Sequence, residues 1–366
     1  MAYLPIENHG VIGDLHSCAL VGIDGTIDWC CLPYFDSPSV FCSILDEKKG
    51  GSFAISATDA VARKQMYLPD SNILLTRSFA KHGLGQVEDF MPIIPRLNRT
   101  KHIHQIVRIV SCIRGEIEYT LECTPAFNYA RNKHKLQRKG SNVLFETEGG
   151  FGYGLVSPIA LSPKKSKLGD GVSVTFTLRE GERLAFVFFS YRANEDNPLE
   201  MLGDPLRHRD DTHNYWQRWI ARCNYHGRWS EMVYRSALTL KMLTFEPTGA
   251  IIASPTMCLP EEIGGGRNWD YRYTWVRDAS FTLYALMRIG YTEEAGAFMN
   301  WLEQRCQEVD TNSDHPLRLM YGIHGEHALD EIELPHLEGY RGSSPVRVGN
   351  GAYDQLQLDI YGEWMD

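Results

Sequence analysis

Short runs of hydrophobic, β-branched and aromatic residues, separated by polar and turn residues, recur through about the first 200 residues, as expected of a series of strands. Asp24-Gly25 separates two such runs, 19–23 and 26–30, and predicts a two-residue hairpin turn because both turn positions favour positive φ. Other β-branched and aromatic runs, most of them separated by Gly, Pro, Asn or Asp, lie at 52–56, 73–79, 86–91, 103–114, 117–124, 143–147, 172–178 and 184–191. The series predicts an antiparallel β-sandwich over residues 1–204, with a barrel as the less favoured alternative.

Beyond residue 204 the apolar positions follow the period of a helix. A helix at 211–220 lies in a predicted linker, 205–227, and an all-α region with loops is predicted over 228–366. Ser230 is the expected N-cap of its first helix, and Gly290 suits the left-handed position after its second. The predicted helices run from Ser230 to shortly before Pro247, from Asp278 to Ile289, from Thr292 to Cys306 and from Gly351 onward. The chain is therefore predicted to be a multidomain β + α protein.

The composition narrows the class of partner. The 366 residues are 43% hydrophobic and carry a net charge of −9 with no long basic run, which argues against nucleic acid as a partner. No window approaches the roughly 18 apolar residues of a membrane helix. The first residues lack the regions of a signal peptide, and nine scattered cysteines fit a reducing compartment. We expect a cytoplasmic protein that binds a neutral or weakly charged ligand.

The segment 264–278 carries the densest chemistry. Aromatic residues occupy positions 269, 271, 273 and 275, so the segment is predicted to be extended, with the four rings on one side. It ends in Arg277-Asp278, where a helix begins. The C–H faces of a pyranose pack on aromatic rings, while Arg donates and Asp accepts hydrogen bonds to its hydroxyls. The pattern therefore indicates a sugar-binding surface.

A structural interpretation of the same residues stays open beside this one. Asp278 is also a suitable helix N-cap, and Arg277 could pair with Asp270. Alternating aromatic residues are also typical of the edge of a buried strand. The pattern alone does not choose between the two interpretations.

The motif Asn268-x-Asp270-Tyr271-x-Tyr273-x-Trp275-x-Arg277-Asp278 resembles the sugar-site segment of glycoside hydrolase family 15, the glucoamylases and related prokaryotic trehalases. Further stretches that resemble the prokaryotic branch occur in order along the whole chain, at 13–16, 24–29, 35–41, 259–261, 320–322, 339–343 and 357–363. The resemblance implies a β-sandwich followed by an (α/α)6 barrel. It also implies cleavage of α-glucosides from the non-reducing end with inversion and without a metal or other cofactor.

The resemblance assigns site residues position by position. Tyr271, Trp275, Arg277 and Asp278 match positions that line the glucose-binding subsite, where Arg277 and Asp278 hold hydroxyls of the terminal glucose. Asn268, Trp269 and Asp270 match supporting positions. Arg341, Asn350 and Gln357 fall in a segment at the barrel mouth, where packing or capping is as good an interpretation as sugar contact.

The resemblance does not place a catalytic acid or base within this chain. An inverting glycosidase needs two carboxyl groups about 6.5–9.5 Å apart. In the family both follow the stretch matched by 357–363, so we expect them beyond Asp366. Residues 228–366 number 139, whereas twelve helices need about 130–145 residues without loops, so only part of the barrel is expected. The remaining acids, Glu326, Glu333, Glu338, Asp359 and Glu363, are interpreted as solvated or helix-pairing groups.

Two histidine patterns, His102-Ile103-His104 and His324-Gly325-Glu326-His327, lack the spacing and the third ligand of a metal site, so no metal is predicted.

The sequence leaves several functions open. The first is an exo-acting, glucoamylase-like glycosidase, and the second is an α,α-trehalase of the same family. The third is a non-catalytic, sugar-binding fragment, because no acid or base is assigned here. A phosphorylase on the same architecture is a weaker alternative, and a homo-oligomer is also left open.

Overall fold

The computed structural model describes residues 3–94, 103–148, 150–193, 198–308 and 317–365. The chain divides into two compact units. The first, the β unit, contains Met1–Asp14, Cys18–Pro33 and Ser37–Gln217. The second, the helical unit, contains Arg218–Asp366 together with two short segments from early in the chain, Leu15–Ser17 and Tyr34–Asp36.

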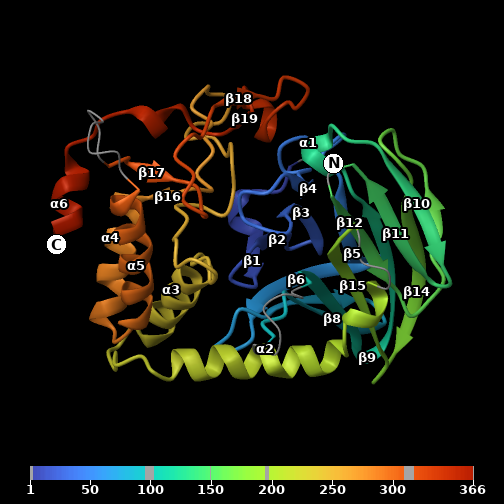
Figure 1. The fold of residues 1–366 in the computed structure, drawn as a ribbon. Helices are drawn as coiled ribbons and strands as arrows, with labels where there is room; N and C mark the ends of the chain where they lie inside the picture. Colours follow the sequence, from blue (N-terminus) through green and yellow to red (C-terminus); the bar gives the residue numbers. More distant parts are fainter. Residues whose placement is uncertain (1–2, 95–102, 149, 194–197, 309–316, 366) are drawn as a thin grey trace. The chain divides into compact units, whose positions relative to one another are not determined.

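The β unit is built from antiparallel strands (Figure 1). Its main path runs β1-β2-β3-β5-β9-β15-β12-β11-β10. Beside this path, β4 pairs with β3, β14 pairs with β9 and β13, and β8 pairs with β9 and leads through β7 to β6. The strands are β1 (His9–Gly13), β2 (Cys18–Gly22), β3 (Thr26–Cys31), β4 (Ser39–Phe41), β5 (Ser52–Ala57), β6 (Ala60–Tyr67), β7 (Leu74–Ala80), β8 (Gly83–Phe90), β9 (Gln105–Thr124), β10 (His134–Lys139), β11 (Asn142–Thr147), β12 (Phe151–Val156), β13 (Ser162–Lys164), β14 (Gly171–Arg179) and β15 (Arg183–Arg192). The predicted hairpin at Asp24-Gly25 is confirmed: it joins β2 to β3, and Gly25 has a φ of 88°.

The sheet folds into two layers, one containing β8 and β15 and the other containing β5 and β14, and strand β9 runs through both. The two strands predicted at 103–114 and 117–124 are one strand of 20 residues, so the predicted break at Gly115 is wrong. Gly115 has a φ of 73° inside the strand, and an added Cβ would lie 2.2 Å from the His82 carbonyl oxygen. The first half of β9 pairs with β8 and β15, and the second half pairs with β5 and β14. The glycine therefore lets one strand pass from one layer to the other.

The two layers enclose one hydrophobic core. The Phe188 ring, from β15, lies 5.0 Å from the Phe41 ring and 6.2 Å from the Phe53 ring, measured between centroids, and these two belong to the other layer. Buried aliphatic residues from both layers complete the same cluster. The large antiparallel β region is thus confirmed, and its two packed layers give the arrangement of a sandwich.

The helical unit holds most of the helices. They are α3 (Ser230–Met242), α4 (Val276–Arg288), α5 (Glu293–Gln307) and α6 (Asp359–Met365), and α2 (Pro205–Ile220) leads into them from the β unit. Four two-residue strands form two small pairs: β16 (Thr274–Trp275) with β17 (Met320–Tyr321), and β18 (Ile332–Glu333) with β19 (Arg347–Val348). Only β16 lies in a segment that the sequence predicted to be extended. Of the described helices, none is long and apolar enough to cross a membrane.

Several predicted helix starts differ from the observed ones. The helix predicted from Asp278 begins two residues earlier, at Val276. Ser230 is the first residue of α3 rather than its N-cap, which is Trp229. The helix predicted from Gly351 is interrupted: a 3-10 turn spans Gly351–Asp354, Gln355 is extended, and α6 begins at Asp359. Asn350 caps the short turn, since its side chain accepts a hydrogen bond from the Ala352 amide. The predicted position of Gly290 is confirmed, because it follows α4 with a φ of 101°.

Candidate functional site

The segment predicted to be extended lies along residues 253–258. The amides of Ala253, Ser254 and Cys258 donate hydrogen bonds of 2.8–2.9 Å to the carbonyls of residues 273, 271 and 269 in turn. An isolated bridge joins Met257 to Asp270. The extended conformation is therefore confirmed up to Trp275, after which α4 begins at Val276. This pairing fixes the backbone that presents the aromatic residues.

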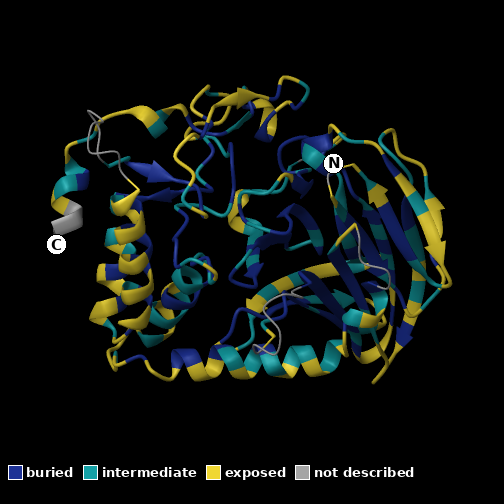
Figure 2. Cartoon of the chain, viewed as in Figure 1, coloured by how far each residue is buried: buried dark blue, intermediate teal, exposed yellow. Residues whose placement is uncertain are grey.

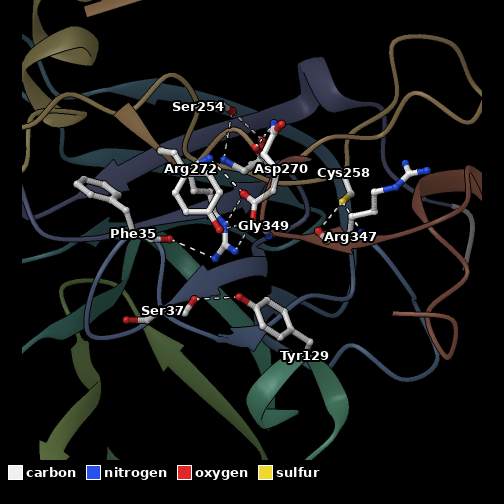
Figure 3. A network of polar contacts seen from close by, with 12 residues as sticks. Phe35, Ser37, Tyr129, Ser254, Cys258, Asp270, Arg272, Arg347 and Gly349 are labelled. Atoms are coloured by element: carbon white, nitrogen blue, oxygen red, sulfur yellow. Dashed lines mark hydrogen bonds and ion pairs between the residues drawn. The ribbon is translucent and has the colours of Figure 1, made fainter. Parts of the chain in front are cut away.

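The charged side of this segment faces the interior. Asp270 and Arg272 are both fully buried and form a two-bonded ion pair with distances of 2.9 and 2.7 Å (Figure 3). Arg272 also donates to the Phe35 carbonyl oxygen at 3.4 Å, and the Asp270 carboxylate accepts from the Gly349 amide at 3.3 Å. The alternative that Arg277 pairs with Asp270 is wrong, because Arg272 occupies that carboxylate. The pair joins three separate parts of the helical unit.

Arg277 instead reaches the start of α6. Its Nη1 donates to Gln357 Oε1 at 3.2 Å and to the Asp359 carboxylate, and its Cζ lies 5.9 Å from the centre of the Trp275 ring. The Arg277 side chain is 39% exposed. One edge of the guanidinium is thus held by protein while part of the side chain remains open to solvent.

Asp278 lies in the first turn of α4 and is exposed. The N-cap of that helix is Trp275, so the alternative that Asp278 acts as the N-cap is wrong. Partial desolvation raises the pKa of Asp278, and the charge of Arg277 acts in the opposite direction. Desolvation raises the pKa of the Tyr271 phenol, the charge of Glu261 adds to the rise, Arg267 opposes it, and Asp278 makes a smaller contribution in the same direction as Glu261. An acceptor carboxylate therefore lies next to an arginine donor and near a phenol.

The aromatic part of the site consists of Tyr271 and Trp275. Their ring centroids are 6.1 Å apart at an interplanar angle of 52°. Tyr271 is half-buried, whereas Trp275 is only 9% exposed. The buried Nε1 of Trp275 has no hydrogen-bond partner within the described part of the chain. Tyr271, Trp275, Arg277 and Asp278 are thus neighbours, and together they offer rings, donors and an acceptor.

Other candidate residues take structural positions. Asn350, besides capping the short turn, donates through Nδ2 to the Asp270 carbonyl oxygen at 3.0 Å, which favours the packing and capping interpretation. Arg341 is exposed, with its Cζ 5.2 Å from the centre of the Tyr340 ring. Asn268 is fully buried and donates to the Gly265 carbonyl oxygen at 3.0 Å.

Several of the acids and histidines singled out in the sequence form hydrogen bonds or ion pairs with other protein groups. Asp359, interpreted from the sequence as a solvated or helix-pairing group, forms an ion pair with Arg277. The position of Asp359 in the sequence does not predict this pairing. The Glu326 carboxylate accepts from the His324 amide at 3.1 Å. His104 Nδ1 forms a buried hydrogen bond of 2.9 Å with Asp14 Oδ2, and His102 lies outside the described residues.

Residues Tyr34–Asp36 are a part of the helical unit that sequence reasoning did not assign to it. The Tyr34 ring packs edge-on against Phe245 and His324, with centroids 5.5 and 5.3 Å apart. Desolvation raises the pKa of Asp36 to about 6, since it outweighs the opposing charge of Arg272. The family resemblance of the stretch 35–41 does not place any of it in the helical unit, and the position of Phe35 and Asp36 there depends on contacts such as the one between Phe35 and Arg272, 237 positions apart.

Comparison with known proteins finds separate family matches for the N-terminal and C-terminal parts of the chain. Residues 227–366 match the family model of "Glycosyl hydrolases family 15", and residues 2–158 match that of "Trehalase-like, N-terminal". A protein of Thermoplasma volcanium named "Trehalase" is 37% identical, over 98% of this chain and 56% of its own length. The "Trehalase" of Thermoplasma acidophilum is 38% identical over 94% and 57%, and that of Mycolicibacterium smegmatis is 34% identical over 99% and 56%.

The chain spans little more than half the length of these curated relatives. Among solved structures, a candidate kojibiose phosphorylase from the human microbiome aligns with 86% of this chain and with 49% of its own chain. The sequence identity is 9% and the TM-score is 0.48, too low to support a conclusion about the fold. The family models and the trehalases agree with each other and with the motif at 268–278. The chain therefore carries a glycosyl hydrolase family 15 domain at residues 227–366, preceded by a trehalase-like N-terminal domain at residues 2–158.

Proposed function

We propose that this chain belongs to an inverting α-glucosidase whose substrate is trehalose. The observation that carries the proposal is the cluster of Tyr271, Trp275, Arg277 and Asp278, which joins aromatic faces to a charged donor and a charged acceptor. Glucose presents C–H faces and hydroxyls that match those groups. The relatives named trehalase favour trehalose over a 1,4-linked glucan.

Each residue has a distinct role in this proposal. The Trp275 ring packs against the terminal glucose, and Arg277 donates to one of its hydroxyls. Asp278 accepts from a neighbouring hydroxyl, a bond that is stronger than a neutral one because the acceptor is ionised. The general acid and base are assigned to the part of the relatives' length that this chain does not span, so the cluster binds the sugar and fixes its orientation.

We also propose that residues 228–366 form the first part of an (α/α)6 barrel. Helix α4 supports this, because Phe281, Tyr284 and Met287 on it are 62%, 59% and 52% exposed. Figure 2 shows exposed positions along this helix. Large apolar residues grouped on one helix favour further packing partners. Adding the remaining part of a relative's length to this chain should bury these residues, as measured by protection of α4 amides from hydrogen exchange. Unchanged protection of α4 would contradict the barrel.

The substrate is tested by calorimetric titration of this chain with trehalose, maltose and maltotriose, followed by assays of glucose release with the full-length gene product. We expect trehalose to bind and to release glucose with inversion. Preference for the maltose series would indicate a glucoamylase instead. Binding without glucose release in the full-length protein would indicate a non-catalytic sugar-binding protein. Release that requires phosphate would indicate a phosphorylase.

A further inference from the structure

The contact between Arg277 and the start of α6 has no assigned role. Arg277 Nη1 is shared between two acceptors, Gln357 Oε1 at 3.2 Å and the Asp359 carboxylate. Arg277 lies on α4 and Asp359 in the first turn of α6, and these two helices pack against each other. The contact therefore joins two elements that are 82 positions apart in the sequence.

We propose that Asp359 and Gln357 are positioning residues that hold the Arg277 guanidinium in the orientation required for sugar binding. The inference rests on the proposed function, since it concerns the same subsite. Neither residue contacts the sugar in this proposal. Both act through Arg277.

The physical reason is the conformational freedom of arginine. A free arginine side chain has many accessible rotamers and loses this conformational entropy when a ligand immobilises it. Arg277 is 39% exposed, so little packing restricts it on its solvent side. Two acceptors on one nitrogen restrict it before the ligand arrives, which reduces the entropy lost on binding. The Trp275 ring, 5.9 Å from the Arg277 Cζ, supports the same orientation.

The two acceptors contribute differently. The Asp359 carboxylate is 34% exposed and pairs with Arg277 as a charge, so its effect is partly screened by solvent. The Gln357 amide is neutral and contributes direction more than attraction. Loss of the charge at 359 should therefore weaken sugar binding moderately, and loss of both acceptors should weaken it further.

The variant Asp359→Asn removes the charge and keeps a side chain of the same size. We expect its dissociation constant for trehalose to rise about two- to fivefold, the upper part of the range of a partly exposed ion pair. The variant Asp359→Glu should recover part of the affinity, because the carboxylate can still reach Arg277. Asp354→Asn, which removes an exposed acid five residues away, is the matched control and should bind as the unaltered chain does.

A double-mutant cycle separates positioning from simple stabilisation of α6. If Asp359 acts through Arg277, Asp359→Asn should have no further effect on affinity in an Arg277→Gln background. An equal loss in both backgrounds would overturn the proposal. An unchanged or higher affinity of the Asp359→Asn single variant would overturn it too, and the latter would show that the ion pair competes with the sugar.

The orientation of Arg277 can also be measured without sugar. The Nε–H signal of Arg277 in NMR spectra should report a restricted side chain in the unaltered chain and a more mobile one in Asp359→Asn. Failure of the unaltered chain to bind trehalose would contradict the proposed function. An unchanged Arg277 signal in Asp359→Asn would contradict the positioning role alone.

Discussion

The sequence is compatible with two roles for Asp278, a helix N-cap or a sugar-binding group, and the structure excludes the first. A carboxylate before a helix is a common N-cap, but α4 begins two residues earlier and has Trp275 at its N-cap position. Asp278 still lies in the first turn, where its charge interacts favourably with the helix dipole. The residue is therefore available to a ligand rather than committed to the helix.

We predict that Asp278→Asn reduces trehalose affinity at least tenfold, because a charge-assisted hydrogen bond to a hydroxyl is lost. The free energy of unfolding should change by less than about 1 kcal/mol, the effect of a charge in the first turn of a helix. Calorimetric titration and urea unfolding measure the two quantities. A large loss of stability with unchanged affinity would contradict the assigned role.

Asp36 gives a prediction about pH. Its pKa is raised from 3.8 to about 6, so between those values the folded chain holds a proton that the unfolded chain has released. Stability therefore decreases as the pH rises from about 4 to about 6, by an amount on the order of 1–3 kcal/mol. In Asp36→Asn this part of the pH dependence should disappear, and above pH 6 the variant should be more stable than the unaltered chain. Parallel stability curves for the two proteins would contradict the assignment.

At the scale of elements, Glu294 joins three parts of the helical unit. Its Oε1 accepts from Trp219 Nε1 at 2.8 Å and lies 3.0 Å from Lys241 Nζ, so residues of α2, α3 and α5 meet at one carboxylate. The Trp219 ring also stacks on Tyr291 with centroids 4.0 Å apart. Burial opposes ionisation of Glu294, but Lys241 and the hydrogen bonds outweigh it and lower the pKa.

We predict that Glu294→Gln lowers the free energy of unfolding by about 2–4 kcal/mol, since Lys241 would be left without its partner in a largely buried site. The stabilisation from Glu294 should be present above the usual glutamate pKa and lost as the pH falls through the lowered value. Thermal or urea unfolding as a function of pH measures both effects. Glu293→Gln is the matched control: its side chain is 77% exposed, and the cost should stay below about 1 kcal/mol.

At the scale of the whole molecule, the buried pair of Asp270 and Arg272 connects the extended segment to Phe35 and Gly349. Tyr271 and Trp275 of the candidate site lie in that segment, and Arg277 and Asp278 come directly after it, in the first turn of α4. Its geometry thus depends on parts of the chain that are far apart in sequence.

We predict that Arg272→Met lowers the free energy of unfolding by about 3–5 kcal/mol, because it leaves a fully buried carboxylate without a counter-charge. The double variant Asp270→Asn/Arg272→Met should be more stable than the single one, since it removes the unpaired charge. Urea unfolding of the three proteins provides the comparison. Equal stability of the single and double variants would contradict the importance of the ion pair.

The sequence by itself determined the β region, the presence of three helices within a few residues of those observed at 230–242, 276–288 and 293–307, the hairpin at Asp24-Gly25 and the extended segment with its family motif. These features depend on local periodicity and turn chemistry, which a short window contains. The tertiary structure decided which charges pair: Arg272 rather than Arg277 takes Asp270, and Asp359 takes Arg277. It also merged two predicted strands into β9 and assigned Tyr34–Asp36 to the helical unit. Such outcomes depend on contacts between distant residues, where several charged partners are locally equivalent and only packing selects among them.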